Sequence, residues 1–384
     1  MTSKLTIDGS GRSYSGWTSV SVTRGIESFA STFSVSLSHV VGDVATIPRM
    51  GELVAIRFDG ELIITGHIER VATTYSADGV GVTVAGRSRT GDLVDCSADL
   101  TSFRQRNIEF IAANLAFPFG IRVDLNELPA DQIQALRDNP FPRFRAQRGE
   151  TVYDAFRRLA KARNVVFQDT PAGDVRLTTA GAAGDAAEAL VVGQNIIRAM
   201  GSFDLSGRFS TYTTKSQRLL DESVDVDVRY EAQDAEIQRF RPLLIIGERG
   251  FTRAAATSRV FWEAATRAGN SITARYTLGS WRQSDGTLWR PNQVVRVRDP
   301  YVGWDDAPML VVDVNYRLDG SEGEKVELSL QPQAAFEIWD PPKRPRVVRK
   351  RVRPTNVFEA ADVLARQRLE RKQRLAKLRS EVVP

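Results

Sequence analysis

Cysteine and histidine are scarce in this sequence of 384 residues. Cys96 is the single cysteine, and His39 and His67 are the two histidines. One cysteine excludes a disulfide within the chain and a thiol cluster for zinc or iron–sulfur, and two histidines are too few for a histidine-rich metal site. A nucleophilic pair of Cys96 with a histidine is the catalytic arrangement that these residues leave open, but a single cysteine is more often a passive small side chain. The sequence therefore predicts no metal and no cofactor.

Long apolar runs are also missing. No stretch approaches the roughly 18 apolar residues that a membrane span needs, and the opening residues, MTSKLTIDGSGR, contain no apolar segment of a secretion signal. The hydrophobic content of 42% and the charged content of 26% are ordinary for a folded soluble protein. We therefore expect a protein that is made and kept in the cytoplasm, with no membrane insertion.

Signatures of catalysis are absent from the sequence as well. It contains no phosphate-binding loop, no dinucleotide fingerprint and no nucleophile elbow. A cell-wall hydrolase would need two carboxylates that face each other across a cleft, whereas Asp305-Asp306 and Asp221-Glu222 are adjacent pairs in loop-like segments. A non-enzymatic role is predicted, and a cell-wall-degrading tail enzyme is the alternative.

Positive charge is concentrated at the carboxyl end. The chain has 52 Lys and Arg against 47 Asp and Glu, of which residues 343–384 hold 14 and 4, so that the first 342 residues hold 38 and 43 and are mildly acidic. We predict that residues 341–384 form a basic, proline-containing arm that docks on an acidic protein surface or a helix bundle. A solvated tail and a nucleic-acid-binding tail are the alternatives, although Phe358 is its only aromatic residue for base stacking. The candidate docking residues are Lys343, Arg344, Arg346, Arg349, Lys350, Arg351 and Arg353.

Alternation of apolar and polar residues marks residues 1–98 as a β domain. Phe33, Val35 and Leu37 alternate with serines, which predicts a strand with one buried face. Asp59-Gly60 lies between two apolar runs and predicts a tight hairpin, because glycine accepts a positive φ without steric cost.

Helical periodicity appears in residues 99–185, which we expect to form a small α/β insert with a short strand after each of two helices. The second helix is predicted to begin at Thr151, with Asp154 in capping-box geometry. Residues 180–187 are rich in Ala and Gly and are predicted to form a flexible linker. The apolar face of the first helix is formed by Ile108, Ile111, Ala112 and Leu115.

Strands return in residues 186–340, which are predicted to form a second β domain with one helix near 252–268. The order of segments in this domain echoes the first domain, and chance similarity between β sequences is the alternative. A true repeat would give two related β modules separated by the insert, which suits a ring-building part better than a single active site. The echoing segments are Pro48–Asp59, Gly66–Val71 and Val82–Arg87 in the first domain, and Pro291–Asp299, Leu310–Val314 and Val326–Leu330 in the second.

Five segments resemble, in order, the baseplate hub protein of Mu-like contractile phages, a family related to the late control D proteins. The resemblance covers roughly residues 5–340 and leaves the basic arm unmatched. The segments are Gly16–Ser28, Val84–Ala98, Glu150–Ala155, Arg239–Ile246 and Gly279–Asn292.

The resemblance implies a mainly β fold with an α/β insert, in which each chain contributes two tube-like β-barrel modules and a homotrimer forms a pseudo-sixfold ring. Such a ring would join a hexameric tail tube to a trimeric central spike, among other baseplate proteins. It would also surround a channel for the tape-measure protein and then for DNA as passing cargo. The implied role is that of a structural protein of the virion tail baseplate, assembled in the bacterial host cytoplasm, in a phage, a tailocin or a related particle. Ring closure would also pair the edge N–H and C=O groups that an open sheet leaves exposed.

Four residues of the body are candidates for structural or interface roles. Arg87 and Asp92 bracket a strand end and the turn or helix start that follows. We expect them to form an ion pair within the module, and a pair across subunits is the alternative. Trp281 and Trp289 frame a hairpin in the last of the resembling segments. The strand face that we expect to line the channel is that of Ser34, Ser36 and Ser38.

Overall fold

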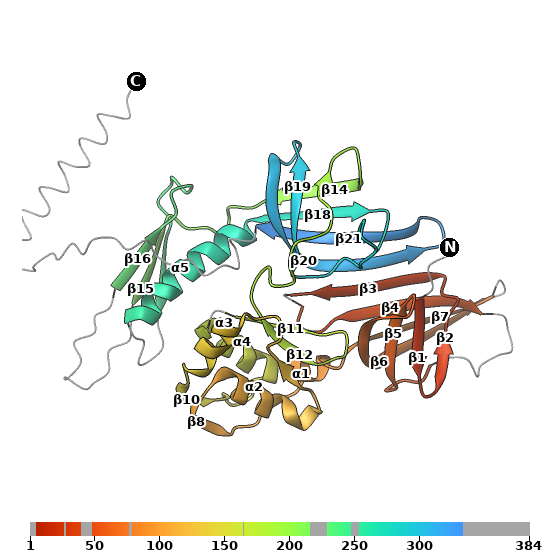
Figure 1. Ribbon diagram of the computed structural model, residues 1–384, viewed down its shortest axis with the longest axis horizontal. Helices are drawn as coiled ribbons and strands as arrows, with labels where there is room; N and C mark the ends of the chain where they lie inside the picture. Colours follow the sequence, from red (N-terminus) through yellow and green to blue (C-terminus); the bar gives the residue numbers. More distant parts are fainter. Residues whose placement is uncertain are drawn as a thin grey trace, which may run out of the picture. The chain divides into compact units, whose positions relative to one another are not determined.

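In the computed structural model of this protein, thirteen strands join into one sheet, and three smaller sheets accompany it among the described residues (Figure 1). The predicted arm, residues 341–384, lies outside the described part together with all of its candidate docking residues, and so does the Asp221-Glu222 pair. The described part comprises residues 5–26, 28–39, 48–76, 79–163, 165–215, 229–246 and 253–332.

The amino-terminal strands form the first group of the large sheet, in the order β3-β4-β7-β6-β5-β1-β2. Every neighbouring pair is antiparallel. The predicted hairpin at Asp59-Gly60 is confirmed, since both residues have a positive φ, 47° and 84°, between β5 and β6. The strands are β1 (Leu5–Gly9), β2 (Arg12–Tyr14), β3 (Ser19–Gly25), β4 (Thr32–His39), β5 (Leu53–Phe58), β6 (Glu61–Ser76) and β7 (Gly79–Ser88).

The second group follows in the order β14-β18-β21-β20. The first part of β20 also pairs with β19, which in turn pairs with the short strand β13. These strands are β13 (Leu190–Val191), β14 (Ile196–Phe203), β18 (Ile272–Leu278), β19 (Val294–Asp299), β20 (Trp304–Asp319) and β21 (Gly323–Pro332).

The two groups repeat one another, as the sequence predicts. Strands β5, β6 and β7 have 6, 16 and 10 residues, and so do β19, β20 and β21. A bulge interrupts the pairing between Ile68 and Arg70 in β6 and between Val311 and Asp313 in β20, which is the same place in both strands. A shared strand order, shared lengths and a shared bulge confirm a structural repeat, which we call module 1 (β1–β7) and module 2 (β13, β14 and β18–β21).

In the part of the chain that the structure describes, neither module is the closed barrel expected from the resemblance. Among the described residues each module is an open sheet, because the edge of β3 pairs with the second half of β20 instead of closing on its own module (Figure 1). The two modules also share one apolar core, to which both contribute fully buried side chains. They are therefore one continuous structure within the chain.

Residues 91–178 contain the helices and short strands that an α/β insert requires, and they enclose an apolar core that is separate from that of the large sheet. The predicted face of the first helix is buried. The second helix begins after Thr151, whose Oγ1 accepts a hydrogen bond from the Asp154 N–H at 3.1 Å. The elements are α1 (Gly91–Asp95), β8 (Ser102–Arg106), α2 (Ile108–Ala116), the 3-10 helix η2 (Phe117–Phe119), β9 (Val123–Asp124), α3 (Ala130–Arg137), β10 (Phe141–Arg145), α4 (Val152–Arg163), β11 (Val166–Asp169) and β12 (Val175–Thr178).

Residues 209–270 contain a small unit that the sequence analysis assigned to the second β domain as a whole. Its three strands form a separate sheet in the order β16-β15-β17, and the predicted helix packs on it through a small core around Tyr212, Ala232 and Val260. The elements are β15 (Thr211–Lys215), β16 (Arg229–Gln233), β17 (Pro242–Ile246) and α5 (Arg253–Asn270).

The prediction that residues 180–187 form a flexible linker is wrong. The Ala186 N–H donates to the Val294 carbonyl at 2.8 Å, and the Val294 N–H donates to the Gly184 carbonyl at 2.9 Å. Small side chains let this segment lie close against the start of β19, where backbone hydrogen bonds hold it in place.

Candidate subunit interface

The junction between the modules is an antiparallel ladder of seven residue pairs between β3 and β20. On its apolar side Val20 lies opposite Leu318, and Val22 lies opposite Tyr316. On its polar side the Ser21 hydroxyl donates to Asn315 Oδ1 at 3.1 Å. This ladder is the chain's own example of how one module adds to another.

Gly25 and Asp313 form the last pair of this ladder. A Cβ on residue 25 would lie 1.8 Å from Asp313 Oδ1, so the Asp313 side chain can hold this position only beside a glycine. Burial raises the pKa of the Asp313 carboxyl, while Arg275 and a hydrogen bond from Ser28 act in the opposite direction. Asp313 Oδ1 itself has no hydrogen-bond partner among the described residues.

Replacing Asp313 with asparagine is expected to stabilise the protein at pH 8 but not at pH 4. The folded-state pKa is above the unfolded value of about 3.9. The favourable contribution of this carboxyl is therefore complete below that value and is lost as the pH rises through the folded pKa. Asparagine stays neutral throughout, so the thermal midpoint of Asp313→Asn should exceed that of the wild type at pH 8, and the two should converge near pH 4.

Asp319→Asn is the matched control on the same strand. Hydrogen bonds from Ser321 lower the pKa of the exposed Asp319 carboxyl, so this substitution should lose stability at pH 8 instead of gaining it. Equal midpoints for Asp313→Asn and the wild type at pH 8 would contradict the expectation.

Two further strand edges resemble those of the junction but are unpaired among the described residues. Strand β14 pairs with β18 on one side only, and the second half of β6, from Arg70 to Ser76, pairs only with β7. Both carry exposed apolar side chains: Tyr75 on β6 is 85% exposed and Phe203 on β14 is 58% exposed. Unpaired edges with apolar side chains invite the addition of another strand.

Nothing in the sequence analysis singled out these edges. One signal was available, because the predicted repeat implies that module 2 should contain a counterpart of each main strand of module 1, including β3. A search for a partner of Ser19–Gly25 in module 2 would have led to Ile196–Phe203, even though the two segments share little sequence.

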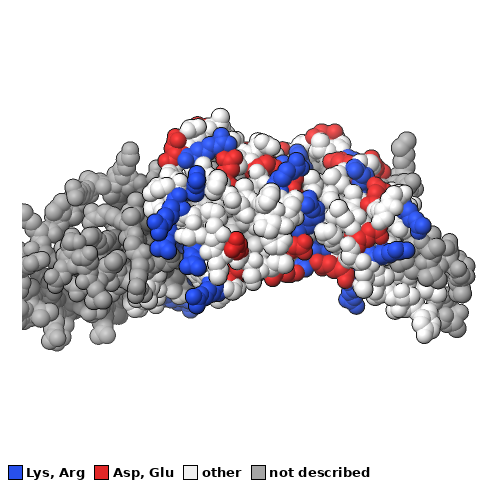
Figure 2. Space-filling model, turned by 90° about the horizontal axis from the view of Figure 1, so that it is seen from below, with Lys and Arg blue, Asp and Glu red and all other residues white. Residues whose placement is uncertain are grey.

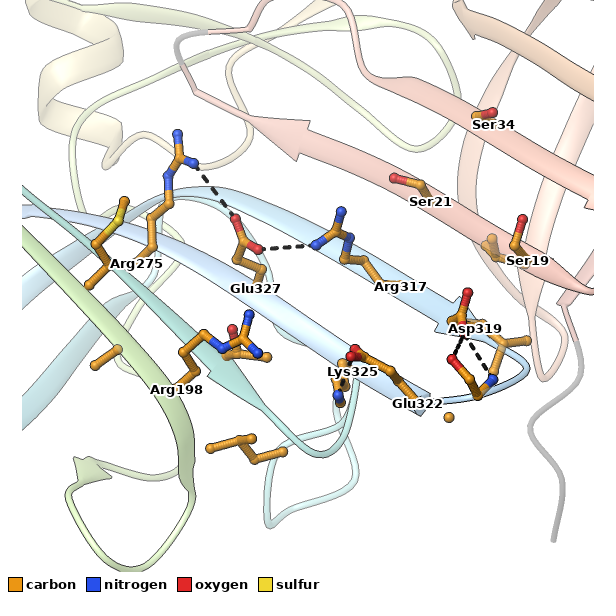
Figure 3. Close-up of a pocket in the computed structure, with 18 residues that line it drawn as sticks. Ser19, Ser21, Ser34, Arg198, Arg275, Arg317, Asp319, Glu322, Lys325 and Glu327 are labelled. Atoms are coloured by element: carbon orange, nitrogen blue, oxygen red, sulfur yellow. Dashed lines mark hydrogen bonds and ion pairs between the residues drawn. The ribbon is translucent and has the colours of Figure 1, made fainter.

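The face of the sheet opposite the shared core is polar and concave (Figure 3). One hollow of about 640 Å³ is lined by side chains of six strands, from Ser34 on β4 to Met200 on β14. On this face Glu327 lies between Arg275 and Arg317, with N···O distances of 4.0 and 3.4 Å. Module 1 contributes mainly hydroxyl groups to the hollow and module 2 contributes charged groups of both signs.

The expected ion pair of Arg87 with Asp92 is not formed. The Arg87 guanidinium contacts Glu69, at 2.8 Å, and Asp95. These two carboxylates hold the pKa of Arg87 above its ordinary value. The reason is geometric, since Asp92 stands in the first turn of α1, whereas Asp95 at its end and Glu69 beside the β6 bulge both reach the end of β7.

Trp281 and Trp289 are core residues and are not exposed for contact with another subunit. Both are fully buried in the shared core. The Trp281 ring lies 4.3 Å from that of Phe58 in module 1, and its Nε1–H donates to the carbonyls of Arg317 and Lys325 at 3.0 and 2.8 Å. Trp281 therefore joins the two modules inside one chain.

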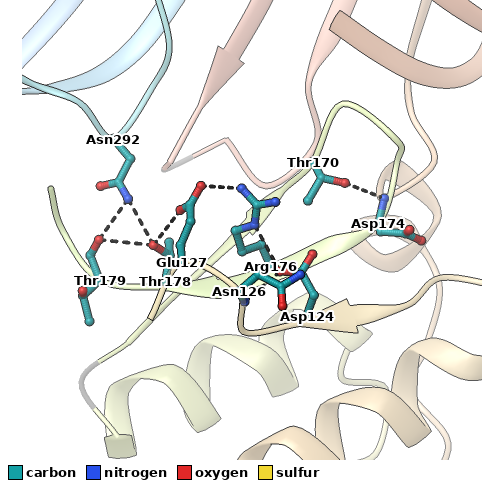
Figure 4. A network of polar contacts seen from close by, with 9 residues as sticks. All are labelled: Asp124, Asn126, Glu127, Thr170, Asp174, Arg176, Thr178, Thr179 and Asn292. Carbon is teal, nitrogen blue, oxygen red and sulfur yellow. Dashed lines mark hydrogen bonds and ion pairs between the residues drawn. The ribbon is translucent and has the colours of Figure 1, made fainter. Parts of the chain in front are cut away.

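A polar network fastens the insert to module 2 (Figure 4). The Asn292 side chain donates to Thr178 Oγ1 at 3.2 Å and to the Thr179 carbonyl at 2.9 Å. The Thr178 hydroxyl donates to Glu127 at 3.0 Å, and Glu127 also pairs with Arg176. This network fixes where the insert sits beside the sheet.

Surface charges of both signs are interspersed on the face that Figure 2 shows. Within the described ranges, no cluster of three or more His, Cys, Asp or Glu side chains is arranged to hold a metal ion. The helices described there also lack the combination of length and apolar content needed to cross a membrane.

Three family models match the chain. The first two coincide with module 1 and with the insert, whereas the third begins at α5 of the small unit and continues through β18–β21 of module 2. Residues 4–88 match the N-terminal domain described as Mu phage baseplate assembly protein GpP-like. Residues 90–179 match the second domain of baseplate hub protein gp44-like, and residues 252–339 match the fourth domain of Mu phage baseplate assembly protein GpP.

Individual proteins that are similar to this chain are also phage baseplate or tail proteins. Baseplate hub protein gp44 of Escherichia phage Mu is 32% identical over 348 residues, which cover 88% of this chain and 90% of that protein. The 43 kDa tail protein of prophage MuSo2 from Shewanella oneidensis is 29% identical with a TM-score of 0.77, covering 87% of this chain and 99% of that one. A tail protein from Neisseria meningitidis MC58 has the same fold, at 22% identity and a TM-score of 0.76, covering 88% of this chain and 98% of that one.

The two β modules, the insert and these likenesses define a structural class, the tail proteins of phages and prophages. Within that class, the chain belongs to the family of the Mu baseplate hub protein gp44. The resemblance drawn from the sequence segments is thereby confirmed.

Proposed function

We propose that this protein is the structural hub of a contractile phage-type baseplate, in which three copies close into a ring that joins the tail tube to the central spike. The observation that carries this proposal is the β3–β20 junction. Two repeated modules in one chain continue a single sheet, and the free edges of β14 and of the second half of β6 are equivalent to the two edges that the junction joins. Repetition of the same contact between chains would close the sheet.

The dimensions of such a ring can be estimated from its number of strands. Eight strands of each chain, from β14 to β6, lie along the path, so three chains supply about 24 strands. At about 4.8 Å between strands the circumference is about 115 Å, and the backbone ring is roughly 37 Å across before strand tilt widens it. In this arrangement the concave polar face lines the channel, where hydroxyl and mixed charged groups would let the tape-measure protein and DNA pass without strong binding.

The other parts have supporting roles in this proposal. Residues 1–98 and 186–340 build the ring, residues 99–185 form the insert, and residues 341–384 form an arm that docks on a neighbouring baseplate protein. The chain acts without catalysis, and assembly takes place in the host cytoplasm.

Light scattering and negative-stain imaging of the purified protein test the proposal. We expect a particle three times the mass of the chain and ring-shaped images with a central opening, as well as co-purification with spike and tube proteins. A chain that stays monomeric at high micromolar concentration, alone and mixed with its spike protein, would contradict the ring. Clearing of peptidoglycan by this chain in a zymogram would favour the alternative of a cell-wall-degrading enzyme.

A further inference from the structure

We infer that β14 of one copy pairs antiparallel with the second half of β6 of the next copy, in the register that β3 and β20 use within the chain. This pairing rests on the proposed ring, and it adds the two strands, their register and the side chains that meet there. The occupant of each free edge is thus a second copy of this chain.

The equivalence of β14 and β3 follows from the ladders that cross each module. In module 1, Val20 pairs with Val35, which pairs with Val84, which pairs with Val71. In module 2 the corresponding row is Ala199, Tyr276, Leu328 and Val314. Ala199 therefore occupies the place of Val20, and Val71 occupies the place of Val314.

The register follows from this equivalence. Within the chain Val20 lies opposite Leu318, Val22 opposite Tyr316 and Arg24 opposite Val314. Between copies the corresponding pairs are Ala199 with Tyr75, Gly201 with Thr73, and Phe203 with Val71. On the other face Met200 meets Thr74, and at the end of the ladder Asp204 meets Arg70.

The backbone groups of β14 point the right way for this ladder. The Asp204 N–H donates to the Ser271 carbonyl at 2.8 Å, so the even-numbered residues of β14 bond to β18. Hydrogen-bonding directions alternate along an antiparallel strand, so Ala199, Gly201 and Phe203 direct their N–H and C=O groups to the free edge. The equivalent residues of β3 are Val20, Val22 and Arg24. They are the residues that bond to β20, because the Ile26 N–H, next in the same alternation, donates to the Val312 carbonyl at 2.9 Å.

The side chains at the two edges are complementary. Tyr75 and Phe203 both lie on the core side of the sheet, and both are exposed in the single chain. Pairing of β14 with β6 would cover both rings and extend the shared core across the boundary between copies. Opposite charges would also meet, because Arg70 and Asp204 are exposed and face each other at one end of the inferred ladder.

Cysteine cross-linking tests the register. In a chain with Cys96→Ser, which removes the exposed native thiol, Thr74→Cys and Met200→Cys are introduced together. In the inferred register these two positions form a non-hydrogen-bonded pair with Cα atoms about 4.5 Å apart, which a disulfide can span. Within one chain they lie on strands seven positions apart in the sheet, about 34 Å along it, so the bond can form only between copies.

Mild oxidation should convert this variant to covalent dimers and trimers on a non-reducing gel, while each single-cysteine variant stays monomeric on that gel. Thr74→Cys with Ser202→Cys is the matched control, two residues out of register and about 7–8 Å apart, and it should cross-link at least tenfold more slowly. Faster cross-linking of the control pair would overturn the register. A trimer by light scattering that shows no cross-link at either pair would overturn the strand pairing and leave the proposed ring standing, whereas a monomer by light scattering would remove the ring itself.

Charge reversal gives a second, independent readout. Arg70→Asp and Asp204→Arg change exposed residues, so each single variant should fold and assemble less tightly by at least threefold. The double variant restores the pair with its charges exchanged and should regain wild-type assembly. Failure of the double variant to recover more than either single change would contradict the contact between Arg70 and Asp204.

Discussion

Replacing Phe203 with aspartate is expected to abolish ring assembly at micromolar concentration and to leave the folded subunit intact. In the single chain the Phe203 side chain is 58% exposed, so its removal costs the subunit little stability. In the inferred ladder it is covered by the next copy, opposite Val71, where a carboxylate would be buried without a partner. Central aromatic contacts of this kind contribute about 2 kcal/mol or more, and the added desolvation should weaken association at least about 100-fold.

Sedimentation velocity over a concentration series measures the association, and the thermal midpoint measures the integrity of the subunit. Phe117→Asp is the matched control, because Phe117 is 80% exposed in the insert, away from both free edges. It should assemble as the wild type does. Normal assembly of Phe203→Asp would show that β14 is not at the subunit boundary.

Replacing Trp281 with alanine is expected to give the largest loss of stability. The indole is fully buried between the modules, near Phe58 and Tyr316 with ring centroids 4.3 and 5.5 Å away. Truncation of a buried tryptophan to alanine typically costs about 3–5 kcal/mol. Here the cavity would open in the core that both modules share, so both modules should lose stability together.

Trp281→Phe separates packing from hydrogen bonding. Phenylalanine keeps most of the ring but removes the Nε1–H that two carbonyls accept, and loss of a donor to buried acceptors costs about 1–3 kcal/mol. Urea unfolding followed by circular dichroism should therefore place this variant between Trp281→Ala and the wild type. A loss of less than about 1 kcal/mol for Trp281→Ala would contradict its role as the link between modules.

Local features of the fold could be predicted from the sequence because their causes are local. The Asp59-Gly60 turn depends on two residues that accept positive φ. The helix that begins after Thr151 depends on a cap contact between residues three apart and on an apolar stripe. The repeat was visible because equal strand spacing leaves equal spacing of turns and apolar segments.

Individual contacts at the candidate site could not be predicted in the same way. Arg87 had several acidic residues within reach along the chain, and only the positions of the β6 bulge and α1 bring Glu69 and Asp95 to it. Trp281 stood in a polar hairpin, and its burial depends on Phe58, more than 200 residues earlier in the chain. Residues 180–187 have the composition of a linker, but backbone bonds to Val294 hold them.

The sequence by itself determined the mainly β character, the insert, the repeat and the family of this protein, because periodicity, turn residues and motifs are written along the chain. The tertiary structure alone decided that β3 pairs with β20, whereas β14 and the second half of β6 are paired on one side only among the described residues. Apolar alternation tells which face of a strand is buried but not which strand lies beside it. That choice is made by long-range backbone pairing, and in this protein it decides where another copy can join.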